Sequence, residues 1–228
     1  YPKLTADVRI DTGIETGYSI STFYDSMFGK LLVRGKNSPD AINRAVSSLQ
    51  QVNLGGLTTN SNLQKNILQY ERFVTCQFDT QFVDDTQGLL TEEPPVSASE
   101  QILAALAIFE SENAISTNSQ SPWKTAIGFR VNMPYRRNVE FSFHDHTYSA
   151  SVAMTADSMT RSVTLDDRDI EVQLFFASDN TLKAIINQVS HTVSYHLDKV
   201  TLYLYTATRS IVAKRISADL GGLAEGGS

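Results

Sequence analysis

The 228-residue sequence contains a single cysteine, Cys76. An internal disulfide and a metal site built from several thiolates are therefore excluded, and the scarcity of thiols favours a reducing compartment. The first histidine of the chain is His144, and no imidazole precedes Cys76. We interpret Cys76 as a structural residue, because a catalytic thiol needs a base or another cation beside it.

Basic residues are also scarce, with 19 Lys and Arg against 25 Asp and Glu and a net charge of -6. A nucleic-acid partner is not expected, because phosphate-binding surfaces need clustered cations. No apolar run approaches the roughly 18 residues of a membrane helix, so we expect no membrane partner. Glycine-rich phosphate-binding loops are absent as well.

The first 85 residues mix short strands with helices, which predicts a small α+β subdomain. A helix begins where Ser38 can serve as N-cap and Pro39 as first helical residue, and Ile42, Val46 and Leu49 fall on one face of it. The other expected elements are strands at 8–12, 18–20 and 30–34 and a second helix at 59–70.

Residues 84–96 are polar, acidic and proline-bearing, and we place a linker at 86–96. The tail at 219–228 is rich in glycine and small residues, which is typical of a flexible linker. The region between them, 97–218, is expected to form a second domain.

This second domain begins with Ser97 and Glu100 at capping-box spacing, ahead of eight successive apolar residues at 102–109. A helix that is apolar on all sides must be enclosed. About eight alternating segments follow at hairpin spacing, which predicts an antiparallel β-barrel wrapped around a central helix. The predicted strands are 139–143, 148–154, 161–165, 170–176, 182–189, 192–197, 200–205 and 211–216.

Side chains with obvious chemistry are few. His144-Asp145-His146 could present two imidazoles, but no third metal ligand is identifiable, and a hairpin turn explains it better. The acidic run 166–169 lacks the glycine and final glutamate of a calcium loop, so it too is interpreted as a hairpin turn. Arg9, in an apolar strand before Asp11, is by default an exposed residue in a weak ion pair.

Several ordered motifs change the interpretation of Arg9. The segments Val8-Arg9-Ile10-Asp11-Thr12 and Tyr24-Asp25-Ser26-Met27-Phe28-Gly29-Lys30-Leu31 resemble the C-terminal subdomain of biotin carboxylases. The resemblance continues through Gly56-Leu57-Thr58-Thr59-Asn60 and Phe78-Asp79-Thr80-Gln81-Phe82, and covers 1–85. Phe28 departs from the aliphatic residue that is usual there.

The second domain is similar to the transfer domain of biotin-dependent acyl-CoA carboxylase α subunits of the methylcrotonyl type. The motifs are Ser121-Pro122-Trp123, Gly128-Phe129-Arg130-Val131-Asn132 and Arg136-Arg137. In that family the domain is a β-barrel around a helix that docks on the carboxyltransferase β subunit. This agrees with the barrel predicted from the apolar pattern.

The resemblance implies a ligase that uses ATP, with Mg or Mn, to carboxylate biotin from bicarbonate. Arg9 matches the catalytic arginine of the family, which contacts bicarbonate and stabilises the biotin enolate. The ATP-grasp region and the biotin-accepting E-A-M-K-M block are absent from the sequence and would precede Tyr1 and follow the tail. This fragment alone is therefore expected to be inactive.

The implied partners are the carboxyltransferase β subunit, a biotin carrier domain and other α subunits in a large hetero-oligomer. Trp123, Arg130, Arg136 and Arg137 are the candidate interface residues; the alternative is that Trp123 is a core residue and Arg136-Arg137 a solvated turn. The expected role is in leucine breakdown in the mitochondrial matrix. The alternatives are a bacterial cytoplasmic location, a propionyl-, geranyl- or other acyl-CoA carboxylase, or a non-catalytic assembly module.

Overall fold

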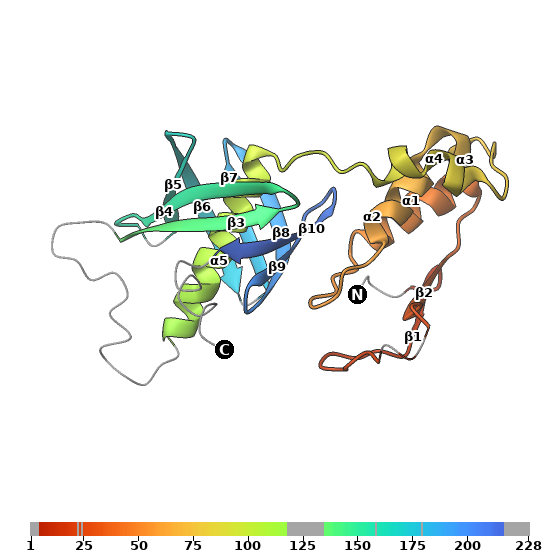
Figure 1. Cartoon of the computed structure of the whole chain (residues 1–228), viewed down its shortest axis with the longest axis horizontal. Helices are drawn as coiled ribbons and strands as arrows, with labels where there is room; N and C mark the ends of the chain where they lie inside the picture. Colours follow the sequence, from red (N-terminus) through yellow and green to blue (C-terminus); the bar gives the residue numbers. More distant parts are fainter. Residues whose placement is uncertain are drawn as a thin grey trace, which may run out of the picture. The chain divides into compact units, whose positions relative to one another are not determined.

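The computed structural model describes residues 5–21, 23, 25–117, 135–157, 159–178 and 180–216. The chain divides into two compact units, which are described separately (Figure 1). The first unit takes in residues 1–53 and 59–93, and the second takes in 54–58 and 94–228. The combination of a small α+β unit and an antiparallel barrel confirms the predicted fold class.

The first unit begins with an antiparallel ribbon of two strands, β1 (Val8–Thr12) and β2 (Gly29–Val33). Both strands were predicted from their alternation. The strand predicted at 18–20 is wrong, because its described residues form no ladder with either strand. Tyr18 is 62% exposed, so a three-residue alternation without a pairing partner stays irregular.

Four helices follow the ribbon: α1 (Ser38–Leu49), α2 (Ser61–Gln69), α3 (Glu71–Val74) and α4 (Phe82–Thr91). The predicted N-cap of α1 is wrong by one residue. Asn37, not Ser38, caps the helix, and its side-chain oxygen accepts a hydrogen bond from the Asp40 amide at 2.9 Å. The amide of Asn37 is an equally good cap as the hydroxyl of Ser38, so the choice was open in the sequence.

Helix α4 occupies most of the segment that was predicted to be a linker. The helix was not predicted because acidic residues and Gly88 interrupt its apolar pattern. Its buried face consists of Phe82, Thr86 and Leu90, which recur every fourth residue. Asn66 of α2 fixes the end of α4 by donating to the Leu90 carbonyl at 2.8 Å. The irregular segment between α4 and the next helix is therefore confined to residues 92–97.

The second unit is organised around helix α5 (Ala98–Thr117). The predicted capping box is confirmed, because the Ser97 amide donates to Glu100 Oε2 at 2.9 Å and the Glu100 amide donates to Ser97 Oγ at 3.3 Å. Residues 102–109 are all at most 1% exposed. The prediction that this helix is enclosed is correct.

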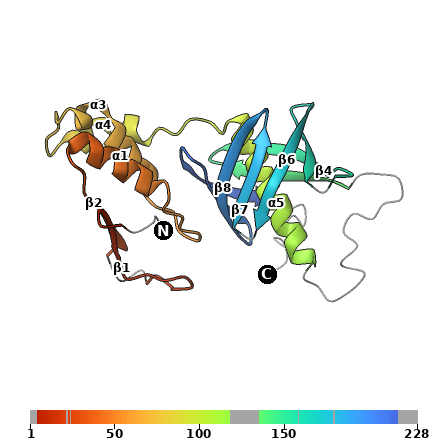
Figure 2. The ribbon, with the colours of Figure 1, turned by 180° about the vertical axis from the view of Figure 1, so that it is seen from behind.

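Eight antiparallel strands close into a barrel around α5, in the order β10-β3-β4-β5-β6-β7-β8-β9. Figure 2 shows β6, β7 and β8 crossing over the helix. Closure leaves no unpaired strand edge. The strands are β3 (Arg136–Phe143), β4 (His146–Met154), β5 (Thr160–Leu165), β6 (Arg168–Ser178), β7 (Thr181–Ile186), β8 (Val189–Asp198), β9 (Thr201–Tyr205) and β10 (Ser210–Ile216).

Two-residue turns set the register of the barrel hairpins. Asp166 and Asp167 both have positive φ, which confirms the hairpin turn expected there, and His144 stands in the turn between β3 and β4. Asn187 and Gln188 likewise have positive φ and form a turn that the sequence had placed within a strand. The predicted strand over 182–189 therefore ends at Ile186.

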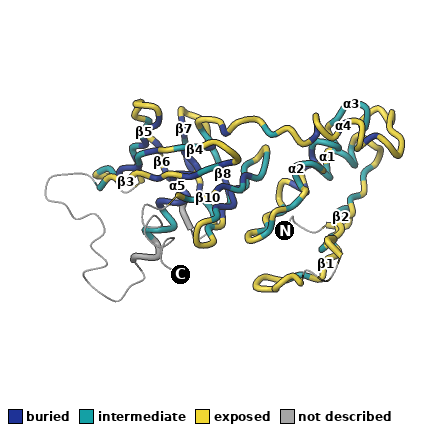
Figure 3. Tube along the Cα trace, in the orientation of Figure 1, coloured by how far each residue is buried: buried dark blue, intermediate teal, exposed yellow. Residues whose placement is uncertain are grey.

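Alternate residues along the strands point into the barrel and pack against α5. Figure 3 shows the resulting alternation of buried and exposed positions. On β3, for example, Val139, Phe141 and Phe143 are all at most 5% exposed. This period of two is the signal from which the barrel was predicted.

Candidate functional site

The candidate site lies on the exposed face of the β1–β2 ribbon. Because successive side chains of a strand point to opposite faces, Arg9 and Asp11 share one face of β1. Val8 and Ile10 are half-buried on the other face. The cross-strand register places Leu32 opposite Arg9 and Lys30 opposite Asp11. The face therefore gathers two cations and one carboxylate.

Arg9 and Asp11 form an ion pair with two parallel contacts. Arg9 Nε lies 2.9 Å from Asp11 Oδ1, and Arg9 Nη2 donates to Asp11 Oδ2 at 3.0 Å. The side chains are 69% and 50% exposed, so the pair is open to solvent. An exposed pair of this kind contributes little to folding, and its clearest effect is to fix the plane of the guanidinium.

A second ion-pair network joins the start of β1 to helix α1. Arg44 on α1 donates from Nη1 to Asp7 Oδ2 at 3.1 Å and from Nε to Asp40 Oδ1 at 3.1 Å. The Lys36 amide and the Arg44 guanidinium, which both donate to Asp40, lower the pKa of its carboxyl group. Arg44 thus fixes α1 beside the strand that carries Arg9.

A glycine just after β2 allows a close approach of the backbone to α1. A Cβ on Gly35 would lie 2.6 Å from Ala41 Cα, so only glycine fits between the end of β2 and α1. Thr12 Oγ1 donates to the Phe28 carbonyl at 2.9 Å and closes the open end of the ribbon. Phe28 of the Tyr24–Leu31 block thus helps to hold the two strands in register.

The two remaining motifs lie at the starts of helices. Gly56 has φ +88, and four residues later Asn60 begins α2, where both its carbonyl and its side-chain oxygen accept hydrogen bonds from Gln64. Asp79 accepts from the Gln81 amide at 3.0 Å at the start of α4. These motif residues therefore have structural roles. The exposed charged residues of the candidate site on the β1–β2 ribbon are Arg9, Asp11 and Lys30.

The candidate interface residues fall into two groups. Trp123 and Arg130 lie outside the described residues. Arg136 extends over the barrel exterior and donates from Nη1 to Thr164 Oγ1 at 3.3 Å. Arg137 makes an ion pair with Glu112 of α5, with Nη1 and Oε2 2.6 Å apart. The charge of Arg137 is therefore engaged within the second unit.

Ion pairs between α5 and the barrel were missed by the sequence analysis. Glu112 also pairs with Arg215, Glu110 pairs with Arg161 at 2.8 Å, and Glu100 pairs with Arg209 at 2.7 Å. Burial raises the pKa of the Glu100 carboxyl, but hydrogen bonds from Arg209 and Ser97 outweigh it, and the pKa is lowered overall. Both ends of the helix are thus fixed to the strands.

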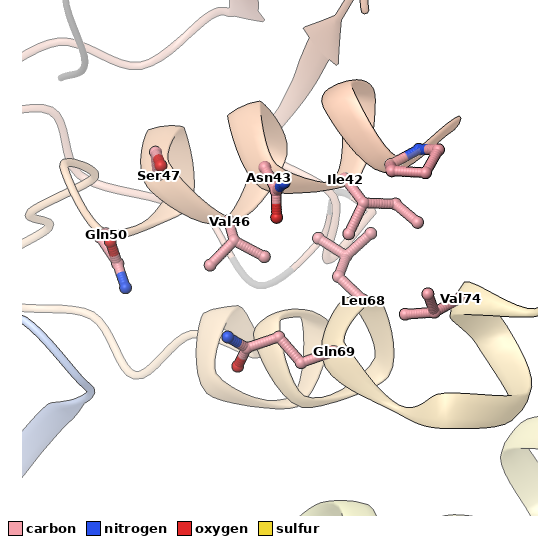
Figure 4. Close-up of a pocket in the computed structure, with 9 residues that line it drawn as sticks. Ile42, Asn43, Val46, Ser47, Gln50, Leu68, Gln69 and Val74 are labelled. Carbon is pink, nitrogen blue, oxygen red and sulfur yellow. The ribbon is translucent and has the colours of Figure 1, made fainter. Parts of the chain in front are cut away.

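A groove of about 600 Å³ lies between α1 and the α2–α3 segment of the first unit (Figure 4). Ile42 and Val46 of α1 face Leu68 of α2, with Val74 at one end. The other lining residues are Pro39 and neutral polar side chains. The lining residues of this groove include no charged side chain.

The described residues contain no group of three or more His, Cys, Asp or Glu side chains arranged to hold a metal ion. The helices within the same described ranges include none that is both long and apolar enough to cross a membrane.

Comparison with known proteins identifies both halves of the chain. Residues 1–85 match the family profile of the biotin carboxylase C-terminal domain. Residues 98–218 match the profile of the BT domain of the methylcrotonyl-CoA carboxylase α subunit. The second match alone spans more than half of the chain and coincides with α5 and the barrel.

Among curated relatives, the mitochondrial methylcrotonoyl-CoA carboxylase subunit α of Dictyostelium discoideum is 25% identical over 93% of this chain and 30% of its own length. The mitochondrial propionyl-CoA carboxylase α chain of Sus scrofa is 28% identical over 72% of this chain and 23% of its own length. The chain thus spans less than a third of either relative.

Solved structures give weaker likenesses. The biotin carboxylase domain of a thermophilic 2-oxoglutarate carboxylase is 24% identical over 41% of this chain and 21% of its own, with a TM-score of 0.39. A pyruvate carboxylase from Rhizobium etli is 24% identical over 47% of this chain and 11% of its own, with a TM-score of 0.41.

Proposed function

Because the chain belongs to the family of biotin-dependent carboxylase α subunits, with a BT domain of the methylcrotonyl-CoA carboxylase type, we propose that it works as part of an acyl-CoA carboxylase. The first unit contributes to the ATP- and bicarbonate-dependent carboxylation of biotin. The second unit docks the subunit on a carboxyltransferase β subunit. The observation that supports this division best is the presence of both family domains in tandem along one chain.

In the proposed reaction Arg9 is the catalytic residue. Its guanidinium is permanently protonated, and its outer Nη1–Nη2 edge contacts no other described residue. Such an edge would present two coplanar N–H donors to a carboxylate-like anion such as bicarbonate, or to an oxygen of bound biotin that gains negative charge. ATP, with Mg or Mn, supplies the activation of bicarbonate, and biotin on a carrier domain receives the carboxyl group.

The docking role belongs to the barrel and to the segment around Trp123 and Arg130. Arg136 is exposed and its single described hydrogen bond leaves most of its donors available to a partner. Arg137 lies on the opposite, inner side of β3, where its ion pair with Glu112 fixes the start of the strand against α5 and so supports that surface. Other α subunits complete the proposed hetero-oligomer.

We further propose methylcrotonyl-CoA as the acyl substrate of the complete enzyme, leucine breakdown as its role and the mitochondrial matrix as its location. The BT-domain match and the mitochondrial relatives support this choice. The similarity to propionyl-CoA carboxylase keeps that enzyme as the alternative.

The role of Arg9 is tested in the full-length subunit that contains this chain. Arg9→Lys keeps the positive charge but removes the planar fork, and we expect the rate of biotin carboxylation to fall by at least about 100-fold. Arg34→Lys, at an exposed arginine just beyond β2, is the matched control and should stay near wild type. A wild-type rate in the Arg9 variant would refute the catalytic assignment.

The second candidate function, an assembly module without catalysis, is favoured by the self-contained barrel. Co-purification of the full-length subunit with the β subunit, with and without Trp123→Ala, distinguishes this function from the first. Loss of co-purification in a variant that still carboxylates free biotin supports a docking role for the Trp123 segment. Unchanged co-purification assigns Trp123 to the core instead.

A further inference from the structure

The ion pair between Arg9 and Asp11 has a geometry that matters for the proposed reaction. A guanidinium has two edges on which it can hold a carboxylate, the side edge of Nε and Nη2 and the outer edge of Nη1 and Nη2. Asp11 occupies the side edge, with distances of 2.9 and 3.0 Å. The outer edge therefore points away from Asp11 and lies in the same plane.

Asp11 is well placed to keep this arrangement. It stands two residues after Arg9 on β1, so both side chains leave the same face of the strand in parallel. Leu32, which lies opposite Arg9, has no acceptor atom on its side chain. Among the described residues, the Arg9 guanidinium is thus oriented by Asp11 alone.

The stability of the fold gives no reason for this pair. Arg9 is 69% exposed at its side chain, and exposed pairs contribute between zero and about 1 kcal/mol. A long flexible side chain, in contrast, loses much of its catalytic effect when its orientation is free, because misplacement by about 1 Å can cost 100-fold in rate. Orientation is therefore the effect that Asp11 can supply.

We propose that Asp11 is the positioning residue of Arg9: it holds the side edge of the guanidinium so that the outer edge is aimed at a carboxylate-like anion. This rests on the proposed function of Arg9. Lys30, opposite Asp11 across the ribbon, leaves the face with a net positive charge, so the Asp11 carboxylate does not cancel the attraction for the anion.

The test uses the full-length subunit and follows biotin carboxylation as bicarbonate and ATP are varied separately. Asp11→Asn removes the charge at constant shape, and we expect kcat/KM for bicarbonate to fall about ten- to hundredfold with little change in KM for ATP. Asp11→Glu restores a carboxylate and should recover a large part of the loss.

Asp7→Asn is the matched control, because Asp7 is 42% exposed and also pairs with an arginine, Arg44, of the same unit. It should stay within about twofold of wild type, since the pair it removes is an exposed structural one. An Asp11→Asn effect no larger than that of Asp7→Asn would overturn the positioning role while leaving Arg9 as the catalytic residue. A wild-type rate in Arg9→Lys would instead overturn the catalytic role of Arg9, on which this proposal rests.

A double-mutant cycle covers the case in which Asp11→Asn lowers the stability of the subunit. If Asp11 acts through Arg9, Asp11→Asn causes little further loss of kcat/KM in the Arg9→Lys background. If the two losses multiply in full, Asp11 acts independently of Arg9 and the proposal is wrong.

Discussion

The two units of this chain use their apolar side chains differently. In the barrel, alternate strand residues and all of 102–109 are withdrawn from water around one core. In the described part of the first unit the buried apolar side chains are only Val46, Leu49, Phe82 and Leu90. Figure 3 shows the contrast as buried positions recurring along the barrel strands in one unit and mainly exposed or half-buried chain in the other.

Exposed apolar side chains strengthen the contrast. The described part of the barrel exposes five large apolar side chains, Met159, Phe175, Val189, Val200 and Ile216, against nine in the described part of the first unit. The barrel is therefore the part that supplies its own stability, whereas the ribbon unit presents surface, Arg9 included. In the first unit the exposed large apolar residues are Tyr18, Ile20, Phe23, Met27, Leu32, Val74, Phe78, Val83 and Leu89.

The largest expected effect is on the core of the barrel. Phe109 of α5 is 0% exposed, and Phe109→Ala should lower the free energy of unfolding of the barrel by about 3–5 kcal/mol through lost burial and a cavity. Leu49→Ala, at 9% exposure in the first unit, should cost about 2 kcal/mol. Hydrogen exchange of the barrel strands and of α1 measures both, and equal losses would contradict the difference between the units.

Acid should weaken the barrel through Glu100. Because the folded-state pKa of Glu100 is lowered, its ion pair with Arg209 contributes stability above the unfolded-state pKa of about 4.3, and this contribution is lost as the pH falls below that value. Glu100→Gln should therefore destabilise the barrel by about 2 kcal/mol at pH 7.

Denaturant unfolding of wild type and Glu100→Gln between pH 7 and 3 measures this contribution. The two free energies of unfolding should converge at the acid end. Asp40→Asn, which removes a half-buried carboxylate of the first unit with a lowered pKa, should show the same sign and a smaller difference. A gap that stays constant with pH for Glu100→Gln would exclude the ionised pair as its cause.

The smallest effects concern two glycines of the first unit. Gly35→Ala should destabilise it by at least about 1 kcal/mol, because the new Cβ meets the backbone of Ala41. Gly88 lies in α4 with open space around it, so Gly88→Ala should stabilise by about 0.5–1 kcal/mol. The melting temperature should fall in Gly35→Ala and rise in Gly88→Ala. A melting temperature that does not fall in Gly35→Ala would show that the contact with Ala41 does not destabilise the unit.

Much of the fold was predictable because it depends on local periodicity. The alternation of the strands, the capping box at Ser97 and the apolar run 102–109 each require only neighbouring residues. The helix α4 was not predicted, since its apolar face is only three residues wide and is hidden among acidic ones.

The pairing of α5 with the barrel could not have been predicted. Glu100 and Arg209 are 109 residues apart and become neighbours only when the barrel closes. The candidate site also combines a predictable and an unpredictable part. Arg9 was predicted from its motif, whereas the role of Asp11 depends on which edge of the guanidinium it contacts. Sequence spacing alone does not define that geometry.

The central claim is that the two units divide catalysis and assembly between them. It is tested most directly by measuring biotin carboxylation and co-elution with the β subunit on the same preparation of the full-length Arg9→Lys subunit. We predict that carboxylation is lost while the complex elutes as in wild type. Retained carboxylation, or loss of the complex together with activity, would contradict the division.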